Sequence, residues 1–440
     1  MRPAEHPHFN DDEIDALFAP LAGASCVALA VSGGPDSLAL LLLMERWCAG
    51  GARPAIHVLT VDHRLHPRSA QDAAFVARLA TERGFAARIL VRGGAAPRTG
   101  IEAAARSVRY RLLIDAAREI GASHIVLAHH RDDQAETFLM RLGRGSGVHG
   151  LAAMRPISVR EGVMLFRPFL DIPKVRLAAV ARAAGVEPVD DAANRDPRFL
   201  RTKLRALLPD LARAGLDAER LADMARQMAL IADAIDAEAS ALLADTVAVD
   251  AFAVARLDAA GYGAAPEAVR LRALTRLLQA IGGGTYPPRG ERLAALDAVL
   301  AGDAARSFRR TLAGTVIERA GEMALFYREG GRTGLPVIEV GDAFDGTWDH
   351  RFRLAIRNRG GDAVAIGPLG AADARRVGGA ARRSPTAALA ALPSIRLKDR
   401  LISVPALDYG PDGAEGLAVA AASLLDVRVF GPRLREATVH

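Results

Sequence analysis

Hydrophobic and polar positions in the first 200 residues follow two alternating periods. Apolar runs of strand length predict β-strands at 25–31, 55–63, 86–91, 124–130 and 163–170. Segments with helical periodicity lie between or after these runs, at 36–48, 69–84, 100–121, 131–142 and 172–185. Strands that alternate with helices are typical of an α/β fold with a doubly wound parallel sheet.

The pattern changes after about residue 200. The segment 203–310 is rich in Ala and Leu and predicts mostly helix, interrupted at 282–290. Short strands are predicted further on, at 315–320, 323–329, 352–358 and 400–407. We therefore expect an α/β domain at 1–205, a mainly helical middle domain at 206–320 and a small α+β C-terminal domain at 321–440.

Composition narrows the class of protein. Of the 440 residues, 50% are hydrophobic and 25% charged, which fits a globular chain with a sizeable core. The N-terminus is polar and acidic, and no apolar stretch approaches a membrane span, so we expect a cytoplasmic protein without a membrane partner. Cys26 and Cys48 are the only cysteines, which excludes a disulfide framework, a zinc cluster and a CxxC redox pair. We interpret both as structural.

Basic residues are concentrated in one part of the chain. The net charge is +6, and residues 141–220 contain 15 Arg or Lys against 9 Asp or Glu. The excess in this segment equals that of the whole chain. It predicts a surface for a phosphate backbone, with an ordinary solvated face as the alternative.

Polar clusters follow the predicted strands at the point where each strand ends. Residues 32–37 follow the first strand, Asp62 and His63 end the second, and residues 129–136 follow the fourth. Because ligands of an open parallel sheet bind beyond the carboxyl ends of its strands, these clusters are expected to meet at one edge.

The segment SGGPDS at 32–37 has the features of an anion-binding turn. It lacks the lysine and the spacing of a Walker A loop. Gly33 and Gly34 let backbone N–H groups approach a ligand closely, and Pro35 suits the first turn of the next helix. The helix N-terminus adds positive potential. The alternative is an ordinary capped turn in which Asp36 complements the helix dipole.

SGGPDS resembles the PP-loop of the ATP pyrophosphatase superfamily, and further segments resemble the tRNA(Ile)-lysidine synthetase family. These are VDHRLHPRS (61–69), IEAAARSVRY (101–110), AHHRDDQAET (128–137), RLGRGSGVHGLAAM (141–154), FRPFL (166–170) and DDAANRDPRFLRTKLR (190–205). Ala193 stands where that family usually has serine, and Thr202 where it usually has asparagine. The resemblance covers residues 27–205.

The resemblance implies a two-step reaction on a tRNA(Ile) with a CAU anticodon. The wobble cytidine attacks the α-phosphate of ATP through its carbon-2 oxygen, and pyrophosphate leaves. The ε-amine of free L-lysine then displaces AMP and gives lysidine, which changes the tRNA from methionine to isoleucine specificity. ATP and Mg²⁺ are the implied cofactors, and the sequence leaves a homodimer as an open alternative to a monomer.

The resemblance also implies site residues for ATP and lysine. ATP is expected to contact Ser32, Gly33, Gly34, Pro35, Asp36, Ser37, Asp62, His63 and His129, with Asp36 on the metal. Adenylation needs charge neutralisation on pyrophosphate, and the attacking amine must lose a proton. Asp133 and Glu136 share a helix face and are assigned to lysine recognition and deprotonation, with Asp132 as a substrate, metal or helix-cap residue. A solvated first turn and a satisfied strand end are the alternatives for the acidic and histidine residues.

The remaining candidates are basic or aromatic. Arg106 and Tyr110 are four residues apart on one predicted helix and are expected to bind the nucleotide, with Arg109 in catalysis. Arg144 lies in a glycine-rich loop that could close over the flipped cytidine. Surface ion pairs are the alternative for the residues of that helix. Arg201 and Arg205, with Lys203 between them, are expected to contact tRNA phosphate or the reacting nucleotide, with a plain solvated face as the alternative.

Three other functions are each consistent with part of these features. A tRNA thiolase of the same superfamily would need cysteines, and Cys26 and Cys48 are badly placed for that role. An amide-forming PP-loop synthetase acting on a small metabolite would not need the basic segment 141–220. A non-catalytic tRNA-binding protein would not need an intact SGGPDS and HHRDDQAET.

Overall fold

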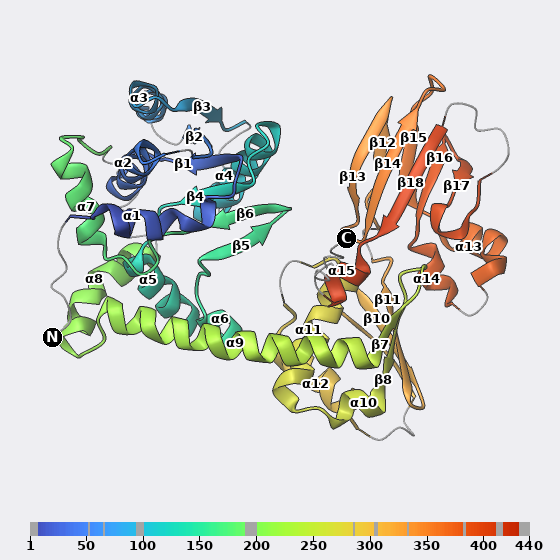
Figure 1. Ribbon diagram of the computed structural model, residues 1–440. Helices are drawn as coiled ribbons and strands as arrows, with labels where there is room; N and C mark the ends of the chain where they lie inside the picture. Colours follow the sequence, from blue (N-terminus) through green and yellow to red (C-terminus); the bar gives the residue numbers. More distant parts are fainter. Residues whose placement is uncertain are drawn as a thin grey trace, which may run out of the picture. The chain divides into compact units, whose positions relative to one another are not determined.

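The computed structural model describes residues 8–51, 53–64, 67–93, 101–189, 200–284, 287–302, 307–331, 334–381, 384–410 and 417–430. The chain divides into two compact units, Met1–Ala232 and Asp233–His440, shown in blue to green and in green to red in Figure 1. Within the described residues, no helix is long and apolar enough to cross a lipid bilayer.

The first unit is built on one sheet. Its strands are β1 (Cys26–Ala30), β2 (Ala55–Asp62), β3 (Ala86–Val91), β4 (His124–Leu127), β5 (Ile157–Arg160) and β6 (Val163–Phe166). The order is β3-β2-β1-β4-β6-β5, and every pair is parallel except the β5–β6 hairpin. The predicted α/β class is confirmed. The antiparallel strand β5 was not predicted, because it is short and leaves Val159 69% exposed at the sheet edge.

Helices α1 (Asp11–Phe18), α2 (Pro35–Ala49), α3 (Ser69–Glu82), α4 (Ile101–Glu119) and α7 (Lys174–Ala183) cover the two faces of this sheet. The other helices are α5 (Arg131–Leu142), α6 (Val148–Leu151), α8 (Leu200–Arg213) and α9 (Ala218–Thr246), and α9 continues into the second unit. Val27 and Leu29 of β1 pack in one core with α1, α2, α3 and α7, whereas Ala28 packs in a second core with α4. Burial on both faces explains why β1 is uniformly apolar.

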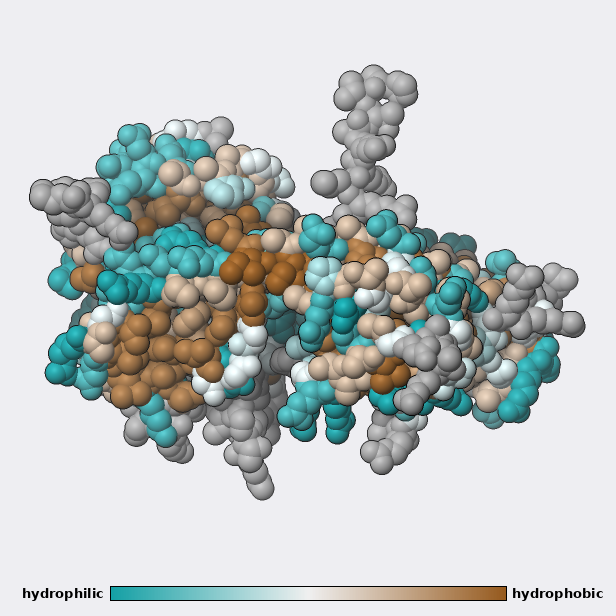
Figure 2. Space-filling view, turned by 90° about the horizontal axis from the view of Figure 1, so that it is seen from below, coloured by the Kyte–Doolittle hydropathy of each residue, from teal (hydrophilic) through white to brown (hydrophobic). Residues whose placement is uncertain are grey.

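A smaller core joins the helices that follow the site. Ala135 and Phe138 of α5 pack against Leu221 and Ala225 of α9, with Leu208 of α8 at the margin. Figure 2 shows hydrophobic side chains between polar ones on the face of the molecule seen from below. Helix α8 has no fully buried residue.

The second unit contains antiparallel sheets. Strands β7 (Val247–Val249), β8 (Ala255–Asp258), β9 (Phe308–Leu312), β10 (Thr315–Ala320) and β11 (Met323–Arg328) form one sheet in the order β7-β8-β11-β10-β9. Helices α10 (Ala259–Ala264), α11 (Glu267–Gly282) and α12 (Gly290–Leu300) lie between β8 and β9 along the chain. The segment predicted as mostly helical thus also contributes β7 and β8. The predicted boundary at 320/321 falls between the paired strands β10 and β11, and the three-domain division stays a prediction.

Two further sheets complete this unit. One contains β12 (Ile338–Val340), β15 (Val364–Pro368), β16 (Pro393–Leu397) and β17 (Arg400–Ser403), and the other β13 (Ala343–Trp348), β14 (Phe352–Asn358) and β18 (Leu417–Ser423). Helices α13 (Ala371–Val377), α14 (Thr386–Ala390) and α15 (Leu425–Phe430) accompany them. The strands predicted at 315–320, 323–329 and 352–358 are confirmed. The strand predicted at 400–407 ends at Ser403, and a 3₁₀ turn begins at Pro405.

Candidate active site

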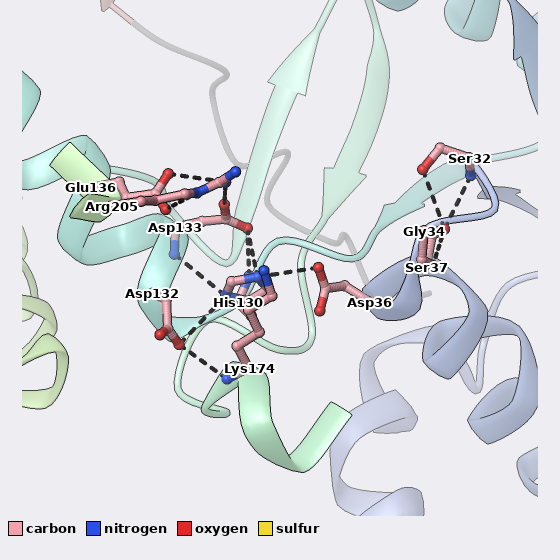
Figure 3. Close-up of polar contacts among 10 residues, drawn as sticks. All are labelled: Ser32, Gly34, Asp36, Ser37, His130, Asp132, Asp133, Glu136, Lys174 and Arg205. Atoms are coloured by element: carbon pink, nitrogen blue, oxygen red, sulfur yellow. Dashed lines mark hydrogen bonds and ion pairs between the residues drawn. The ribbon is translucent and has the colours of Figure 1, made fainter. Parts of the chain in front are cut away.

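The polar clusters converge where the sheet changes winding direction. Strand β1 lies between β2 and β4, so the connections from β1 and β4 leave to opposite sides and open a crevice at the carboxyl ends of these strands. The SGGPDS turn follows β1, and the HHRDD segment follows β4. Figure 3 shows side chains from both segments pointing toward one another.

The SGGPDS turn is held in shape by its two serines. The Ser37 hydroxyl accepts a hydrogen bond from the Ser32 backbone N–H at 3.1 Å and donates to the Gly34 carbonyl at 3.0 Å. The two hydroxyl groups are 3.3 Å apart. Gly34 is the N-cap of α2 and Pro35 is its first residue, as predicted. The turn therefore presents the N-terminus of a long helix to the crevice.

Gly33 is required by the local backbone. Its φ is +86°, and a Cβ built there would lie 2.8 Å from Cγ2 of Val189 and 3.2 Å from Cγ2 of Val76. Its carbonyl also accepts a hydrogen bond from the Val189 N–H at 3.0 Å. Gly34 meets only the Ser32 hydroxyl, at 3.9 Å. Gly33 thus holds the turn against Val76 and Val189, while Gly34 leaves space for a ligand to approach the backbone.

His130 connects the turn to helix α5. Its Nε2 lies 3.4 Å from Oδ2 of Asp36 and 3.5 Å from Oδ2 of Asp133, and its Nδ1 lies 3.7 Å from Oδ2 of Asp132. Burial lowers the pKa of His130, but the three carboxylates raise it by more, so its net shift is upward. Asp36 and the acidic first turn of α5 therefore belong to one site (Figure 3).

The acidic residues of α5 have different partners. Asp133 forms a capping box with His130, accepting a hydrogen bond from the His130 N–H at 3.1 Å. Asp132 instead accepts a hydrogen bond from the Lys174 backbone N–H at 3.0 Å, at the first residue of α7. A helix-cap role for Asp132 was one of the sequence predictions. The structure places that cap on α7 and not on the helix that carries Asp132.

Glu136 forms a two-point ion pair with Arg205 of α8. Arg205 Nε donates to Oε1 at 2.5 Å and Nη2 donates to Oε2 at 3.2 Å, while Nη2 lies 3.8 Å from Oδ1 of Asp133. The Glu136 side chain is 2% exposed. Its burial raises the pKa of this carboxyl by more than Arg205 lowers it. Asp133 and Glu136 thus lie together, and the structure adds Arg205, which the sequence had assigned to tRNA contacts.

A group of arginines surrounds the buried Tyr110. Arg106 donates to the Tyr110 hydroxyl at 3.2 Å, and the guanidinium carbons of Arg106 and Arg109 lie 5.1 and 6.0 Å from the ring centroid. Arg160 lies 4.8 Å from the same centroid. Burial raises the pKa of Tyr110, but Arg106, Arg109 and Arg167 lower it by more. Arg106 and Tyr110, which the sequence predicts to bind the nucleotide, therefore contact each other.

His129 is buried beside this group. Burial lowers its pKa well below the ordinary value, and the charges of Arg109, Arg167, Arg106 and Arg201 lower it further. Its Nδ1 has no hydrogen-bond partner among the described residues. Burial and the nearby arginines thus favour the uncharged imidazole, and its Nδ1 is available to a ligand. Arg201, on α8, interacts electrostatically with both Arg109 and Glu136.

Some residues that the sequence predicts for the site lie at the margins of the group around His130. Asp62 accepts hydrogen bonds from the Ser69 hydroxyl at 2.6 Å and the Arg64 N–H at 2.9 Å, so one of its oxygens organises the turn before α3. Burial raises its pKa, but these two hydrogen bonds and the charges of Arg64 and His63 together lower it by more. His63 follows directly and is half-buried, and Arg144 is exposed in the loop after α5. Ala193 lies outside the described residues, and Thr202 is half-buried on α8.

The cysteines lie away from this crevice. Cys26 begins β1 and Cys48 is near the end of α2, so both are at the opposite edge of the sheet. Both are free, and burial raises the pKa of each thiol. A thiol with a raised pKa is a poor nucleophile.

The geometry combines two chemistries in one crevice. The turn and the α2 N-terminus offer backbone dipoles for phosphate, and Asp133 with Glu136 offers carboxylates for an amine. Comparison with known proteins agrees with this combination. Residues 7–211 match the PP-loop domain family. A tRNA(Ile)-lysidine synthase of Bradyrhizobium diazoefficiens is 46% identical over 70% of this chain and 91% of that protein.

The chain belongs to the tRNA(Ile)-lysidine synthase family. The tRNA(Ile)-lysidine synthase of Rhodopseudomonas palustris is 44% identical over 73% of this chain and 96% of that protein. That of Ruegeria pomeroyi is 37% identical over 86% of this chain and 88% of that protein. The family resemblance predicted from the motifs is confirmed, and with it an enzyme of the ligase class and the use of ATP by the PP-loop domain.

A likeness to solved structures is weaker. A U34-tRNA thiolase from Methanococcus maripaludis has a TM-score of 0.44 and 16% identity, over 50% of this chain and 77% of that chain. A similarity of this size carries no argument about activity.

The structure adds residues to which the sequence gave no role. Arg167 lies beside Tyr110, and Gln134 and Arg141 hold the loop after α5. His130, for which the sequence offered the adenosine pocket or a satisfied strand end, instead contacts Asp36 and Asp133. His130 lies in the HHRDDQAET segment and Arg167 in FRPFL, so the motifs contained them. Asp36, one partner of His130, and Tyr110, the partner of Arg167, are distant in sequence, and the motifs gave no indication of these contacts.

Proposed function

We propose that this protein ligates free L-lysine to carbon 2 of the wobble cytidine of a CAU-anticodon tRNA(Ile), through an adenylated cytidine. The observation that supports this most directly is the contact of His130 with both Asp36 and Asp133. It joins a phosphate-binding turn to a pair of carboxylates suited to an amine. A reaction that first activates a base with ATP and then attacks it with an amine needs both in one crevice.

In the first step, the carbon-2 oxygen of cytidine attacks the α-phosphate of ATP, and pyrophosphate leaves. Backbone N–H groups at Gly33, Gly34 and the start of α2 bind the departing phosphates. Ser32 and Ser37 keep the turn in shape through the hydrogen bonds between them. Fixed donors of this kind stabilise developing charge without reorganisation during the reaction.

Asp36 fits a role in holding Mg²⁺. Its Oδ1 is buried and has no hydrogen-bond partner among the described residues. No group of three His, Cys, Asp or Glu that could hold a metal occurs in the described parts of the chain, so the other ligands would come from phosphate and water. This matches the preference of Mg²⁺ for one or two carboxylates plus substrate phosphates. When bound, the ion would neutralise charge on pyrophosphate.

In the second step, the lysine ε-amine attacks carbon 2, and AMP leaves with the electron pair of the bond to the carbon-2 oxygen. The ammonium must first lose a proton, and Glu136 has the raised pKa that favours accepting one. Asp133 lies beside it and provides a second negative charge. Arg205 holds both Glu136 oxygens, so lysine binding must displace or share this guanidinium.

The tRNA contacts come from the basic residues. Arg106, Arg109 and Tyr110 of α4 bind the reacting nucleotide, and Arg201 and Arg144 approach it from α8 and the glycine-rich loop. The neutral His129 and the residues Asp62 and His63 remain predictions for the adenosine pocket. A homodimer and a cytoplasmic location also stay predictions.

The decisive experiment combines the protein, ATP, Mg²⁺, labelled lysine and a CAU-anticodon tRNA(Ile) transcript. Label is expected in the tRNA, and none in a matched transcript whose wobble cytidine is replaced by uridine. Absence of label from the CAU transcript would refute the proposal. Label that is incorporated equally into both transcripts would refute the choice of cytidine.

Two variants test the site assignments separately. Asp36→Ala is expected to slow pyrophosphate release and to raise the Mg²⁺ concentration required, and unchanged rates across a Mg²⁺ titration would contradict its metal role. Glu136→Gln keeps the shape of the side chain and is expected to slow lysine transfer by about 10²–10⁴-fold, with pyrophosphate release little changed. Loss of adenylation with an unchanged lysine KM would place the lysine site elsewhere.

A further inference from the structure

The loop after α5 is fixed at one end and exposed at the other. It runs from Gly143 to Met154 and contains the short helix α6. Gly143, Arg144 and Gly145 are exposed, and Gly145 has a φ of +69°. Ala153 is buried, and it packs with Ala135 and Phe138 of α5. The two ends therefore differ in how firmly they are held.

Two side chains of α5 hold the buried end. The Gln134 amide donates to the Met154 carbonyl and accepts from the Met154 N–H, both at 2.8 Å. Arg141 Nη1 donates to the carbonyls of Gly150 at 2.7 Å and Ala153 at 2.9 Å. Ala153 has a φ of +49°, a conformation that a residue with a side chain adopts only when its surroundings hold it. Arg141 supplies one of those contacts.

Arg141 also belongs to a set of positive charges without acidic partners. Burial lowers its pKa, and the charges of Arg106 and Arg144 lower it further, so the three guanidinium groups lie within electrostatic range of one another. Among the described side chains, none of the three pairs with a carboxylate. We call Arg106, Arg141 and Arg144 the arginine cluster. Like charges gathered without counter-ions indicate a site for an anion.

We propose that Arg141 is a positioning residue for tRNA: it fixes the 143–154 loop so that Arg144 and Arg106 together receive phosphodiester groups of the anticodon loop. The inference rests on the proposed function. Arg141 Nη1 donates its hydrogen bonds to loop carbonyls, so this nitrogen cannot also bind a phosphate. Arg106 and Arg144 are exposed, so their guanidinium groups can bind one. The phosphates of ATP are already assigned to the turn at 32–37, which follows β1. The arginine cluster lies elsewhere, on α4, on α5 and in the loop after α5.

The test compares tRNA binding by Arg141→Ala, Arg144→Ala and the double variant, with Arg111→Ala as control. Arg111 is an exposed arginine of α4 outside the cluster, so its loss changes net charge equally. Each cluster variant is expected to raise the tRNA Kd and KM about tenfold, or about 1.4 kcal/mol, with kcat and ATP KM within about threefold. Arg144→Ala should also reduce the salt dependence of tRNA binding, by about 0.7–0.9 in the log–log slope.

The double variant distinguishes positioning from independent contacts. If Arg141 acts through Arg144, the tRNA Kd of the double variant should be at most about twofold higher than that of Arg144→Ala. A Kd that reflects the sum of both single losses overturns the positioning role. Hydrogen exchange in residues 143–154 should accelerate in Arg141→Ala and not in Arg144→Ala. Arg141→Lys, which keeps a donor for one carbonyl, should restore part of the affinity.

Other outcomes are equally informative. A larger rise in ATP KM than in tRNA KM would assign the cluster to the nucleotide and overturn the proposal. A lower melting temperature for Arg141→Ala with unchanged tRNA KM would leave it a purely structural residue. If Arg141→Ala does not fold, Arg144→Ala still tests the cluster. Failure of the wild-type protein to form lysidine, by contrast, would count against the proposed function and not against phosphate binding.

Discussion

The Glu136–Arg205 pair predicts an asymmetric response to removing one partner or the other. Glu136 is 2% exposed and Arg205 is 35% exposed, so only the carboxylate depends on its partner for solvation. Breaking a buried pair by removing one partner costs about 3–5 kcal/mol. Because Arg205 is partly solvated, we expect about 3 kcal/mol for Arg205→Ala. Glu136→Gln removes the charge and leaves a guanidinium that water can reach, so we expect about 1–2 kcal/mol.

The free energy of unfolding of the two variants should depend on pH in different ways. Burial already holds the pKa of Glu136 above its ordinary value, and loss of Arg205 should raise it further. A carboxyl whose pKa is higher in the folded than in the unfolded state takes up a proton on folding between the two values. Stability of Arg205→Ala should therefore increase as the pH falls through that window, and Glu136→Gln should lack this dependence.

The assay is thermal unfolding of the full chain at several pH values, with hydrogen exchange in β1 and β4 identifying the transition of the first unit. For a unit of this size, 3 kcal/mol corresponds to a decrease of about 6–12 °C in melting temperature. The double variant should be more stable than Arg205→Ala, because the amide no longer needs a cation. A double variant as unstable as the sum of the single changes would refute the reasoning, as would a larger loss for Glu136→Gln.

Further predictions concern three other contacts. Gly33→Ala should cost about 1–3 kcal/mol and abolish the rise in melting temperature on adding ATP, since the φ of +86° and the 2.8 Å approach to Val189 leave no room for a Cβ; retained ATP stabilisation would contradict this. Asp132→Ala should cost about 1 kcal/mol through loss of the cap on Lys174, with lysine KM within about threefold, and a much larger KM would indicate direct contact with substrate. Arg319→Met should cost about 3 kcal/mol, because Arg319 donates to the carbonyls of Val299, Leu300 and Gly302 at the end of α12; faster hydrogen exchange there with unchanged ATP binding is the expected signature.

Local patterns predicted the first unit well and the second less completely. Strands β1, β2, β4 and β6 lie where apolar runs occur, because strands inside the sheet are buried for most of their length. Strand β3 is an edge strand with only Leu90 buried, and it was predicted because its sequence is largely apolar all the same. Strand β5 escaped prediction because it is an exposed edge. In the second unit, β7 and β8 lie within a helix-rich segment. Strand β8 pairs with β11, far along the chain, and β7 pairs in turn with β8.

The candidate site divides in the same way. The sequence alone determined that Asp36, Asp133 and Glu136 lie at one sheet edge, because a parallel sheet places the carboxyl ends of its strands together. Only the tertiary structure decided that Asp132 caps α7, that His130 joins Asp36 to Asp133, and that Arg205 holds Glu136 from a helix 69 residues away. Periodicity and turn chemistry are properties of neighbouring residues. Which side chains meet depends on how the helices pack, and packing is settled by the whole core.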